Sequence, residues 1–178
     1  MHSVEALRHA IGRVPHFPKE GILFYDISPL LVRADLGRSV VAHMERLVTP
    51  YAPTIIAGVE SRGFIMASAL ALHMGVGFLM VRKKGKLPGR VRSLSYSLEY
   101  GHDCVEAQEG LVDKGASVVL VDDLMATGGT LSACVRLLES MALDVKAAVT
   151  LVELTSLKGR ESITVPFSSV IEIEKAGV

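Results

Sequence analysis

The sequence has little cysteine, with only Cys104 and Cys134 among its 178 residues. The two positions do not form a metal-binding spacing, and Cys134 lies on the apolar face of an expected helix. Isolated thiols of this kind are usually buried and reduced inside the cell. We therefore expect two reduced thiols, at least half-buried, in a protein of a reducing compartment.

An excess of charge is also absent, because 19 basic residues balance 19 acidic ones. This balance argues against a nucleic-acid-binding protein that depends on overall positive charge. No apolar run is long enough to span a membrane, and residues 1–13 lack the apolar core of a signal peptide. We expect a soluble cytoplasmic protein that binds neither nucleic acid nor membrane.

Apolar side chains are abundant and make up 49% of the residues. That fraction excludes wholesale disorder, and 178 residues suffice for one compact domain with a substantial core. The chain contains no internal repeat or low-complexity tract. We expect a single domain over residues 1–178.

Strand and helix patterns alternate along the chain. After an extended segment at 22–27, strands are expected at 54–59, 77–81, 117–121 and 145–154, and helices at 4–11, 35–47 (capped by Asp35), 63–74 and 131–141. Such alternation predicts an α/β fold with a central parallel sheet flanked by helices.

The most informative stretch is 118–130, Val-Val-Leu-Val-Asp-Asp-Leu-Met-Ala-Thr-Gly-Gly-Thr. Four apolar, mostly β-branched residues predict a buried parallel strand, with Asp122 and Asp123 at its carboxyl end. A helix follows, which Thr130 could cap, because apolar residues recur at helical spacing: Leu131, Cys134, Val135, Leu138 and Met141. Ligands bind off the carboxyl ends of strands in open α/β sheets, so this turn should face a ligand.

The turn itself has the chemistry of a phosphate site. Backbone N–H groups at a helix start and two hydroxyls are offered by Ala126, Thr127, Gly128, Gly129 and Thr130. Asp122 and Asp123 would repel phosphate, but they suit ribose hydroxyls or Mg²⁺ one sugar away. The other common phosphate loops, G-x-x-x-x-G-K-[ST] and G-x-G-x-x-G, are absent. A ribose 5-phosphate site is favoured over a plain strand–helix connection.

Two further segments carry charge near this expected edge of the sheet. Glu60-Ser61-Arg62-Gly63 again joins a strand end to a helix start, and Arg62 can hold a phosphate through two parallel hydrogen bonds. Residues 82–86, Arg-Lys-Lys-Gly-Lys, form the only dense basic run. Its position favours attraction of a pyrophosphate over a nucleic-acid patch or a solvated surface, with Lys83 and Lys84 interpreted as solvated charge.

An alternating segment, Leu94, Tyr96, Leu98 and Tyr100, is followed by a turn at 101–102 and a second extended segment at 103–107. This pattern predicts a two-stranded flap with one apolar face. A flap over the site would exclude water from the reaction.

The 118–130 stretch resembles the 5-phosphoribosyl-1-pyrophosphate (PRPP) motif of type I phosphoribosyltransferases. Within that family the chain resembles the adenine phosphoribosyltransferases over nearly its whole length, through segments 21–24, 60–64, 82–89, 96–101 and 157–161. The resemblance implies the type I fold, with a small N-terminal hood at about 1–34 and a β-hairpin flap at about 90–107. It also implies transfer of the phosphoribosyl group from PRPP to adenine, giving AMP and pyrophosphate, with Mg²⁺ held mainly through substrate oxygens.

The resemblance assigns roles to individual residues. Adenine would lie against Leu23, Phe24, Tyr25 and Leu124, with Phe24 stacking on the ring and backbone groups binding its edge. Relatives often carry arginine where this chain has Tyr25, a departure that binding through the backbone should tolerate. Pyrophosphate would bind Glu60, Ser61, Arg62, Arg82 and Lys86, with a cis peptide between Glu60 and Ser61.

In the same family the flap glutamate approaches the purine and handles its proton, which implies a catalytic role for Glu99, with Tyr100 beside it in the flap. The basic run lies near a subunit contact in relatives, so we expect a homodimer. Two alternatives stay open: a regulator that only senses PRPP, and a phosphoribosyltransferase for another base such as hypoxanthine or xanthine.

Overall fold

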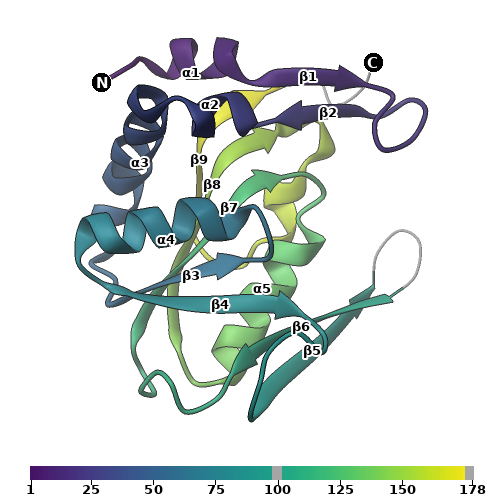
Figure 1. Cartoon of the computed structure of the whole chain (residues 1–178). Coiled ribbons are helices and arrows are strands. Elements are labelled where there is room, and N and C mark those ends of the chain that lie inside the picture. Colours follow the sequence, from purple (N-terminus) through teal and green to yellow (C-terminus); the bar gives the residue numbers. More distant parts are fainter. Residues whose placement is uncertain (98–101, 175–178) are drawn as a thin grey trace.

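The computed structural model describes residues 1–97 and 102–174. A seven-stranded sheet forms its centre, in the order β5-β6-β4-β3-β7-β8-β9 (Figure 1). The strands are β3 (Ile55–Val59), β4 (Gly77–Lys83), β5 (Val91–Ser97), β6 (His102–Gln108), β7 (Ser117–Met125), β8 (Asp144–Leu154) and β9 (Phe167–Ile173). Neighbours from β4 to β9 pair in parallel, whereas β6 pairs antiparallel with both β4 and β5. The predicted α/β fold class is confirmed.

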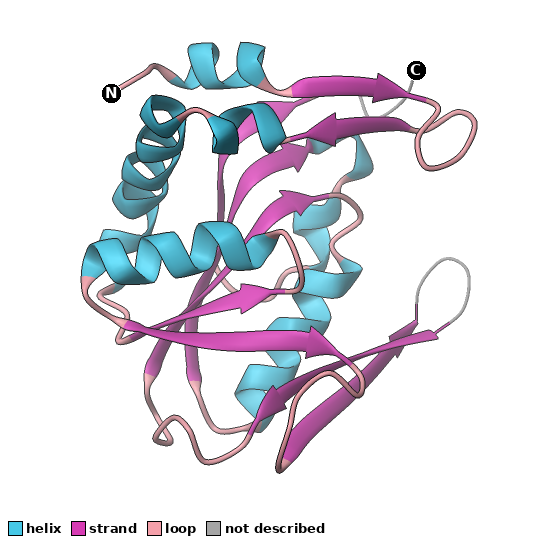
Figure 2. Cartoon of the chain, viewed as in Figure 1, coloured by secondary structure: helices cyan, strands magenta, loops and turns pink. Residues whose placement is uncertain are grey.

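Helices cover both faces of the sheet (Figure 2). The elements are α1 (Val4–Ala10), α2 (Ser28–Val32), α3 (Ala34–Val48), α4 (Gly63–Met74) and α5 (Gly129–Ser140), with short 3-10 turns η1 (Thr49–Tyr51), η2 (Thr155–Leu157) and η3 (Gly159–Ser162). Helices α3 and α4 pack on one face and α5 on the other. Each face therefore has its own apolar core.

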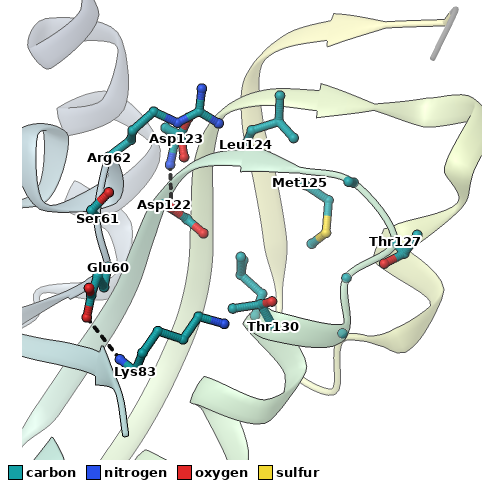
Figure 3. Close-up of a pocket in the computed structure, with 14 residues that line it drawn as sticks. Glu60, Ser61, Arg62, Lys83, Asp122, Asp123, Leu124, Met125, Thr127 and Thr130 are labelled. Atoms are coloured by element: carbon teal, nitrogen blue, oxygen red, sulfur yellow. Dashed lines mark hydrogen bonds and ion pairs between the residues drawn. The ribbon is translucent and has the colours of Figure 1, made fainter. Parts of the chain in front are cut away.

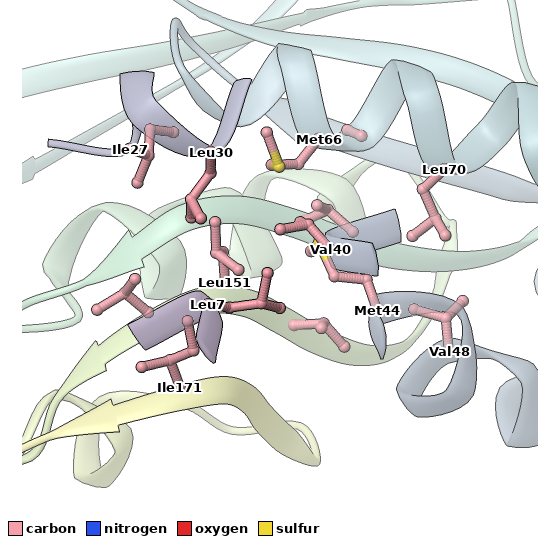
Figure 4. Packing of buried hydrophobic residues seen from close by; sticks show 14 of the residues in the cluster. Leu7, Ile27, Leu30, Val40, Met44, Val48, Met66, Leu70, Leu151 and Ile171 are labelled. Atoms are coloured by element: carbon pink, nitrogen blue, oxygen red, sulfur yellow. The ribbon is translucent and has the colours of Figure 1, made fainter. Parts of the chain in front are cut away.

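The core on the α3–α4 face reaches into the N-terminal segment. Leu7, Ile27 and Leu30 are at most 1% exposed and pack with Met44 and Leu151 (Figure 4). A two-stranded antiparallel hairpin, β1 (Gly12–Pro15) with β2 (Leu23–Asp26), lies beside them, apart from the large sheet. Burial of these apolar side chains holds the N-terminal segment against the sheet.

Several element boundaries differ from those predicted. Strand β7 continues four residues beyond the expected end, to Met125, so both of its aspartates lie within the strand. The predictions that Asp35 and Thr130 cap helices are wrong. Arg33 and Gly128 occupy the two cap positions, and Asp35 instead pairs with Arg33 and His2. Strands β1 and β9 and helix α2 were not predicted.

Over the residues that the structure describes, none of the helices combines the length and apolar character required to cross a membrane.

Candidate active site

A cavity of about 360 Å³ opens at the carboxyl edge of the parallel strands (Figure 3). Its walls are Glu60, Ser61 and Arg62 after β3, Lys83 at the end of β4, and the continuous run 122–131 from β7 into α5. Strands β3 and β7 are neighbours in register, with Gly58 opposite Val121, so their carboxyl ends meet at one edge. Two turns that are far apart in sequence thereby face one another, as the sequence predicts.

Residues 126–130, the phosphate loop from here on, lead into the N-terminus of α5. Gly128 has φ +83°, which glycine adopts without strain. A Cβ on Gly128 would lie 2.3 Å from the carbonyl oxygen of Gly159, whereas a Cβ on Gly129 would meet no protein atom within 4 Å. The loop is therefore packed tightly against residue 159 and open at Gly129. The N-terminus of a three-turn helix behind it favours an anion.

Asp122 and Asp123 are both buried at the cavity wall, 8% and 5% exposed. The backbone N–H of Asp123 donates to Asp122 Oδ1 at 2.8 Å. Burial, and then the charge of Asp123, raises the pKa of Asp122 well above its ordinary value. Burial also raises the pKa of Asp123, against the opposing effect of Arg62. Two adjacent buried carboxylates require a partner that stabilises their charge.

Arg62 supplies part of the charge that stabilises these carboxylates. Its Nε pairs with Asp123 Oδ2 at 2.9 Å, and Arg62 Nη1 is buried without a hydrogen-bond partner among the described residues. Buried polar groups in native proteins are usually satisfied. Unsatisfied atoms on a cavity wall therefore mark a place where a bound polar ligand would contribute hydrogen bonds.

The peptide between Glu60 and Ser61 is cis, which confirms that expectation. Glu60 accepts hydrogen bonds from Arg82 Nε at 3.1 Å, from the Lys83 backbone N–H at 2.9 Å and from Lys86 Nζ at 2.6 Å. Burial alone would raise the pKa of Glu60, but these hydrogen bonds, Lys86 first, outweigh it and lower the pKa to about 2. Arg82 and Lys86 thus gather on Glu60 beside the cavity and do not line it.

Lys83, interpreted from sequence as solvated charge, is instead a half-buried residue of the cavity wall. Its ammonium group extends toward Thr130 (Figure 3), donates to the Tyr96 hydroxyl at 3.2 Å and pairs with Asp103. The Tyr96 hydroxyl lies 3.1 Å from Thr130 Oγ1. A signal was present in the sequence, because Lys83 falls two residues after Val81, on the buried face of the same strand.

The residues assigned to adenine lie on β2 and β7. The Phe24 ring is half-buried, with the Arg62 guanidinium 4.9 Å from its centroid and Phe17 5.1 Å away at an edge. Tyr25 is only 3% exposed and its side chain belongs to the apolar core. Leu23 and Leu124 pack against the same core, and Leu124 also lines the cavity. Tyr25 could therefore contact a base only through its backbone groups.

The two flap residues with assigned roles, Glu99 and Tyr100, lie outside the described residues. The described strands β5 and β6 do form the predicted antiparallel hairpin, with Ser97 opposite His102.

Comparison with known proteins identifies the family. A family model for the phosphoribosyl transferase domain matches residues 38–177. An adenine phosphoribosyltransferase of Rhodospirillum rubrum is 52% identical over 165 residues, 93% of this chain and 96% of that protein.

Solved structures agree with that match. The crystal structure of adenine phosphoribosyltransferase from Thermoanaerobacter pseudethanolicus has a TM-score of 0.93 and 40% identity, covering 96% of this chain and 100% of that one. The Saccharomyces cerevisiae enzyme, complexed with D-2,5-dideoxy-2,5-imino-altritol 1,6-bisphosphate and adenine, has a TM-score of 0.89 and 36% identity, covering 94% and 97%. The chain therefore belongs to the phosphoribosyltransferase family and, within it, to the adenine phosphoribosyltransferases.

Proposed function

We propose that the cavity between β3, β4 and β7 is the active site in which this enzyme transfers the 5-phosphoribosyl group of PRPP to adenine, giving AMP and pyrophosphate. One observation carries the assignment. A pair of buried carboxylates and a helix-start loop with an open glycine line one cavity, together with an arginine that is paired with Asp123 and has one unsatisfied buried nitrogen. Ribose hydroxyls, a phosphate and a pyrophosphate together match these three groups.

The phosphate loop would bind the 5′-phosphate through the backbone N–H groups of Ala126, Thr127, Gly128, Gly129 and Thr130 and the two threonine hydroxyls. Asp122 and Asp123, just before the loop, would accept hydrogen bonds from the ribose hydroxyls. Both ends of the sugar phosphate are then fixed, which aligns the anomeric carbon with the incoming base and the leaving group.

Pyrophosphate would bind on the opposite wall, at Ser61, Arg62 and Lys83, with Arg82 and Lys86 held next to it by Glu60. The anomeric carbon gains positive charge as pyrophosphate leaves, and the leaving group gains negative charge. Fixed cations close to that group stabilise it in the transition state more than in the ground state.

Magnesium fits the same place. Mg²⁺ prefers oxygen ligands and commonly takes one or two carboxylates plus substrate phosphates. Asp122 and Asp123 offer buried carboxylate oxygens at the cavity wall. We propose that PRPP and pyrophosphate oxygens supply most of the shell. The ion, when bound, would neutralise charge on the leaving group.

Adenine would enter between Phe24 of the hood (about 1–34) and Leu124, with backbone groups of residues 23–25 binding its edge. Support comes from the position of Phe24, whose ring is already in contact with Arg62 at the cavity. Within the flap (about 90–107) we assign proton transfer at the purine to Glu99, with Tyr100 beside it, on the resemblance of segment 96–101.

A homodimer is supported by an exposed apolar face. Ile65, Ala69 and Leu72 recur at helical spacing on the outer side of α4, and Leu72 is 83% exposed. Phe78 and Met80 extend this surface onto β4. Apolar surface of this kind marks protein interfaces, and it borders Arg82, whose guanidinium lies 5.9 Å from the Phe64 ring.

We also assign the enzyme to the cytoplasm. Cys134 is fully buried, and burial raises the pKa of its thiol, which keeps it protonated and unreactive. Cys104, which is half-buried, is also an unpaired thiol, and the absence of a disulfide between the two described cysteines fits a reducing compartment.

Neighbouring lysines on β4 and in the turn after it test the pocket assignment. Lys83 lines the cavity, whereas Lys84 is exposed and does not. Lys83→Met should weaken pyrophosphate binding by about 10- to 100-fold, the range for a lost hydrogen bond to a charged group, and Lys84→Met should leave it within about twofold. Calorimetry with magnesium pyrophosphate measures both. Equal effects of the two substitutions would place pyrophosphate elsewhere.

A further inference from the structure

Residues 157–161, Leu-Lys-Gly-Arg-Glu, lie outside the cavity walls but directly against the phosphate loop. A Cβ on Gly159 would lie 2.2 Å from the Ala126 carbonyl oxygen and 2.9 Å from the Gly128 nitrogen. From the other side, a Cβ on Gly128 would lie 2.2 Å from Ser162 Oγ. The backbones of the loop and of η3 therefore touch with no room for a side chain between them. Any shift of residue 159 is transmitted to the loop.

The neighbouring residue, Arg160, ties this turn to the sheet. Arg160 Nε donates to Glu153 Oε1 at 2.8 Å and Arg160 Nη2 to Glu153 Oε2 at 2.5 Å, the two-bond geometry that arginine makes with a carboxylate. Glu153 is 1% exposed and also accepts from the Ser169 hydroxyl at 3.0 Å. Arg160 Nη2 further reaches Glu172 on β9, at 3.3 Å.

The strand register places this pair close to the site. Glu153 of β8 lies opposite Met125 of β7, the residue that immediately precedes the phosphate loop. Glu153, next to the start of the phosphate loop, thus binds Arg160 and thereby holds η3, the turn that packs against the loop. No part of Arg160 lines the cavity, so any effect on a ligand would act through the loop.

We propose that Arg160 is a positioning residue for the phosphate site, whose paired hydrogen bonds to Glu153 hold Gly159 against the phosphate loop in the conformation that accepts the 5′-phosphate. The proposal rests on the assignment of residues 126–130 to that phosphate. It makes η3 and β8 part of the binding machinery, although neither touches the substrate.

The test compares two ligands that occupy different walls of the cavity. AMP carries the 5′-phosphate, whereas magnesium pyrophosphate would bind at Ser61, Arg62 and Lys83. Residues that orient the ligands of a metal ion commonly change its affinity by about 10- to 100-fold, and we expect an effect of similar size for a residue that orients the phosphate loop. Arg160→Met should therefore weaken the affinity for AMP by about 10-fold, as measured by calorimetry. The affinity for magnesium pyrophosphate should change by less than about twofold. Arg160→Lys, which keeps the charge but loses the paired geometry, should fall between the parent protein and Arg160→Met.

Lys146→Met is the matched control. Lys146 lies on the same strand as Glu153, pairs with Asp144 at 2.5 Å and has a side chain 43% exposed, against 49% for Arg160. It should leave both affinities unchanged. Unfolding midpoints are recorded for every variant, and Arg160→Lys carries the test if Arg160→Met does not fold.

Two outcomes overturn the proposal. Unchanged AMP affinity in the Arg160 variants would do so, and so would an equal loss for AMP and pyrophosphate, since that result indicates general loosening of the fold. Gly129→Ala separates this failure from a failure of the loop assignment. If Gly129→Ala weakens AMP binding and the Arg160 variants do not, the positioning role of Arg160 is wrong and the assignment of the phosphate loop stands.

Discussion

Glu60 combines a buried position with three donors, from Arg82, Lys86 and the Lys83 backbone. Its pKa in the folded protein is about 2, against an ordinary value of 4.5. Because the folded state favours the ionised form, the pairing stabilises the protein fully above about pH 4.5. That stabilisation is lost as the pH falls from 4.5 toward 2.

A Glu60→Gln variant should therefore be less stable than the parent protein at neutral pH, by at most about 3.4 kcal/mol given 1.36 kcal/mol per pKa unit. The difference should shrink as the pH is lowered through 4 toward 2. Denaturant unfolding of both proteins at a series of pH values measures it. A difference that stays constant over that range would show that the ionisation of Glu60 is not what the neighbouring cations stabilise.

Individual residues were predictable where their role follows from position in a strand–helix turn. Arg62, Asp122 and Asp123 were placed at the site because each follows a strand pattern, and they do line the cavity. Lys83 was missed because its setting depends on β6 pairing next to β4, which brings in Asp103 from 20 residues away. The alternation along β4 does place Lys83 on the same face as Val81, but its pairing with Asp103 cannot be predicted from local pattern.

The phosphate loop is shaped by two glycines with different surroundings. Gly128 has a positive φ and packs directly against Gly159. Gly128→Val would therefore disturb the packing of the loop as well as the binding of a ligand. Gly129 begins α5, lines the cavity and has no protein atom near its Cβ position. An added methyl group there occupies open space.

Gly129→Ala should therefore fold with unchanged stability and bind AMP about 10- to 100-fold more weakly, since small displacements of a bound group can cost that much. Gly37→Ala is the control, because it lies in α3 with its nearest atom, the Leu30 carbonyl oxygen, at an ordinary 3.6 Å. Calorimetric titration with AMP compares the two. Full AMP affinity in Gly129→Ala would remove this turn from the phosphate site.

Elements were predicted best where periodicity is strong and local. Helix α4 was predicted with the bounds that it has, 63–74, and α5 within two residues at its start. Strand β7 was ended too early, because a run of apolar residues gives way to aspartates while sheet pairing with β8 continues to Met125. Strand β1 owes its extended form to its partner β2, and its own sequence gives little signal. Strand β9 was missed although Val170, Ile171 and Ile173 are typical strand residues.

The whole molecule presents an apolar face on α4 and β4, described above, that a monomer would leave in water. We expect Leu72→Glu to convert the proposed homodimer to monomers, because a carboxylate buried at the interface would lose its hydration. Leu111→Glu should not, since Leu111 is also exposed, at 64%, but lies between β6 and β7, next to Val112, which packs against the core on the α5 face. Sedimentation velocity separates the species. A fully active monomer of the parent protein at assay concentration would contradict the dimer.

Substrate choice tests the central claim most directly, because it depends on the hood, the flap and the cavity acting together. Backbone groups that bind the edge of adenine would be left unpaired by a 6-oxo purine, and unpaired buried groups are costly. With PRPP and magnesium, kcat/KM should be at least about 100-fold higher for adenine than for hypoxanthine or guanine. Comparable turnover of either of those bases, or no AMP formed from adenine, would contradict the account.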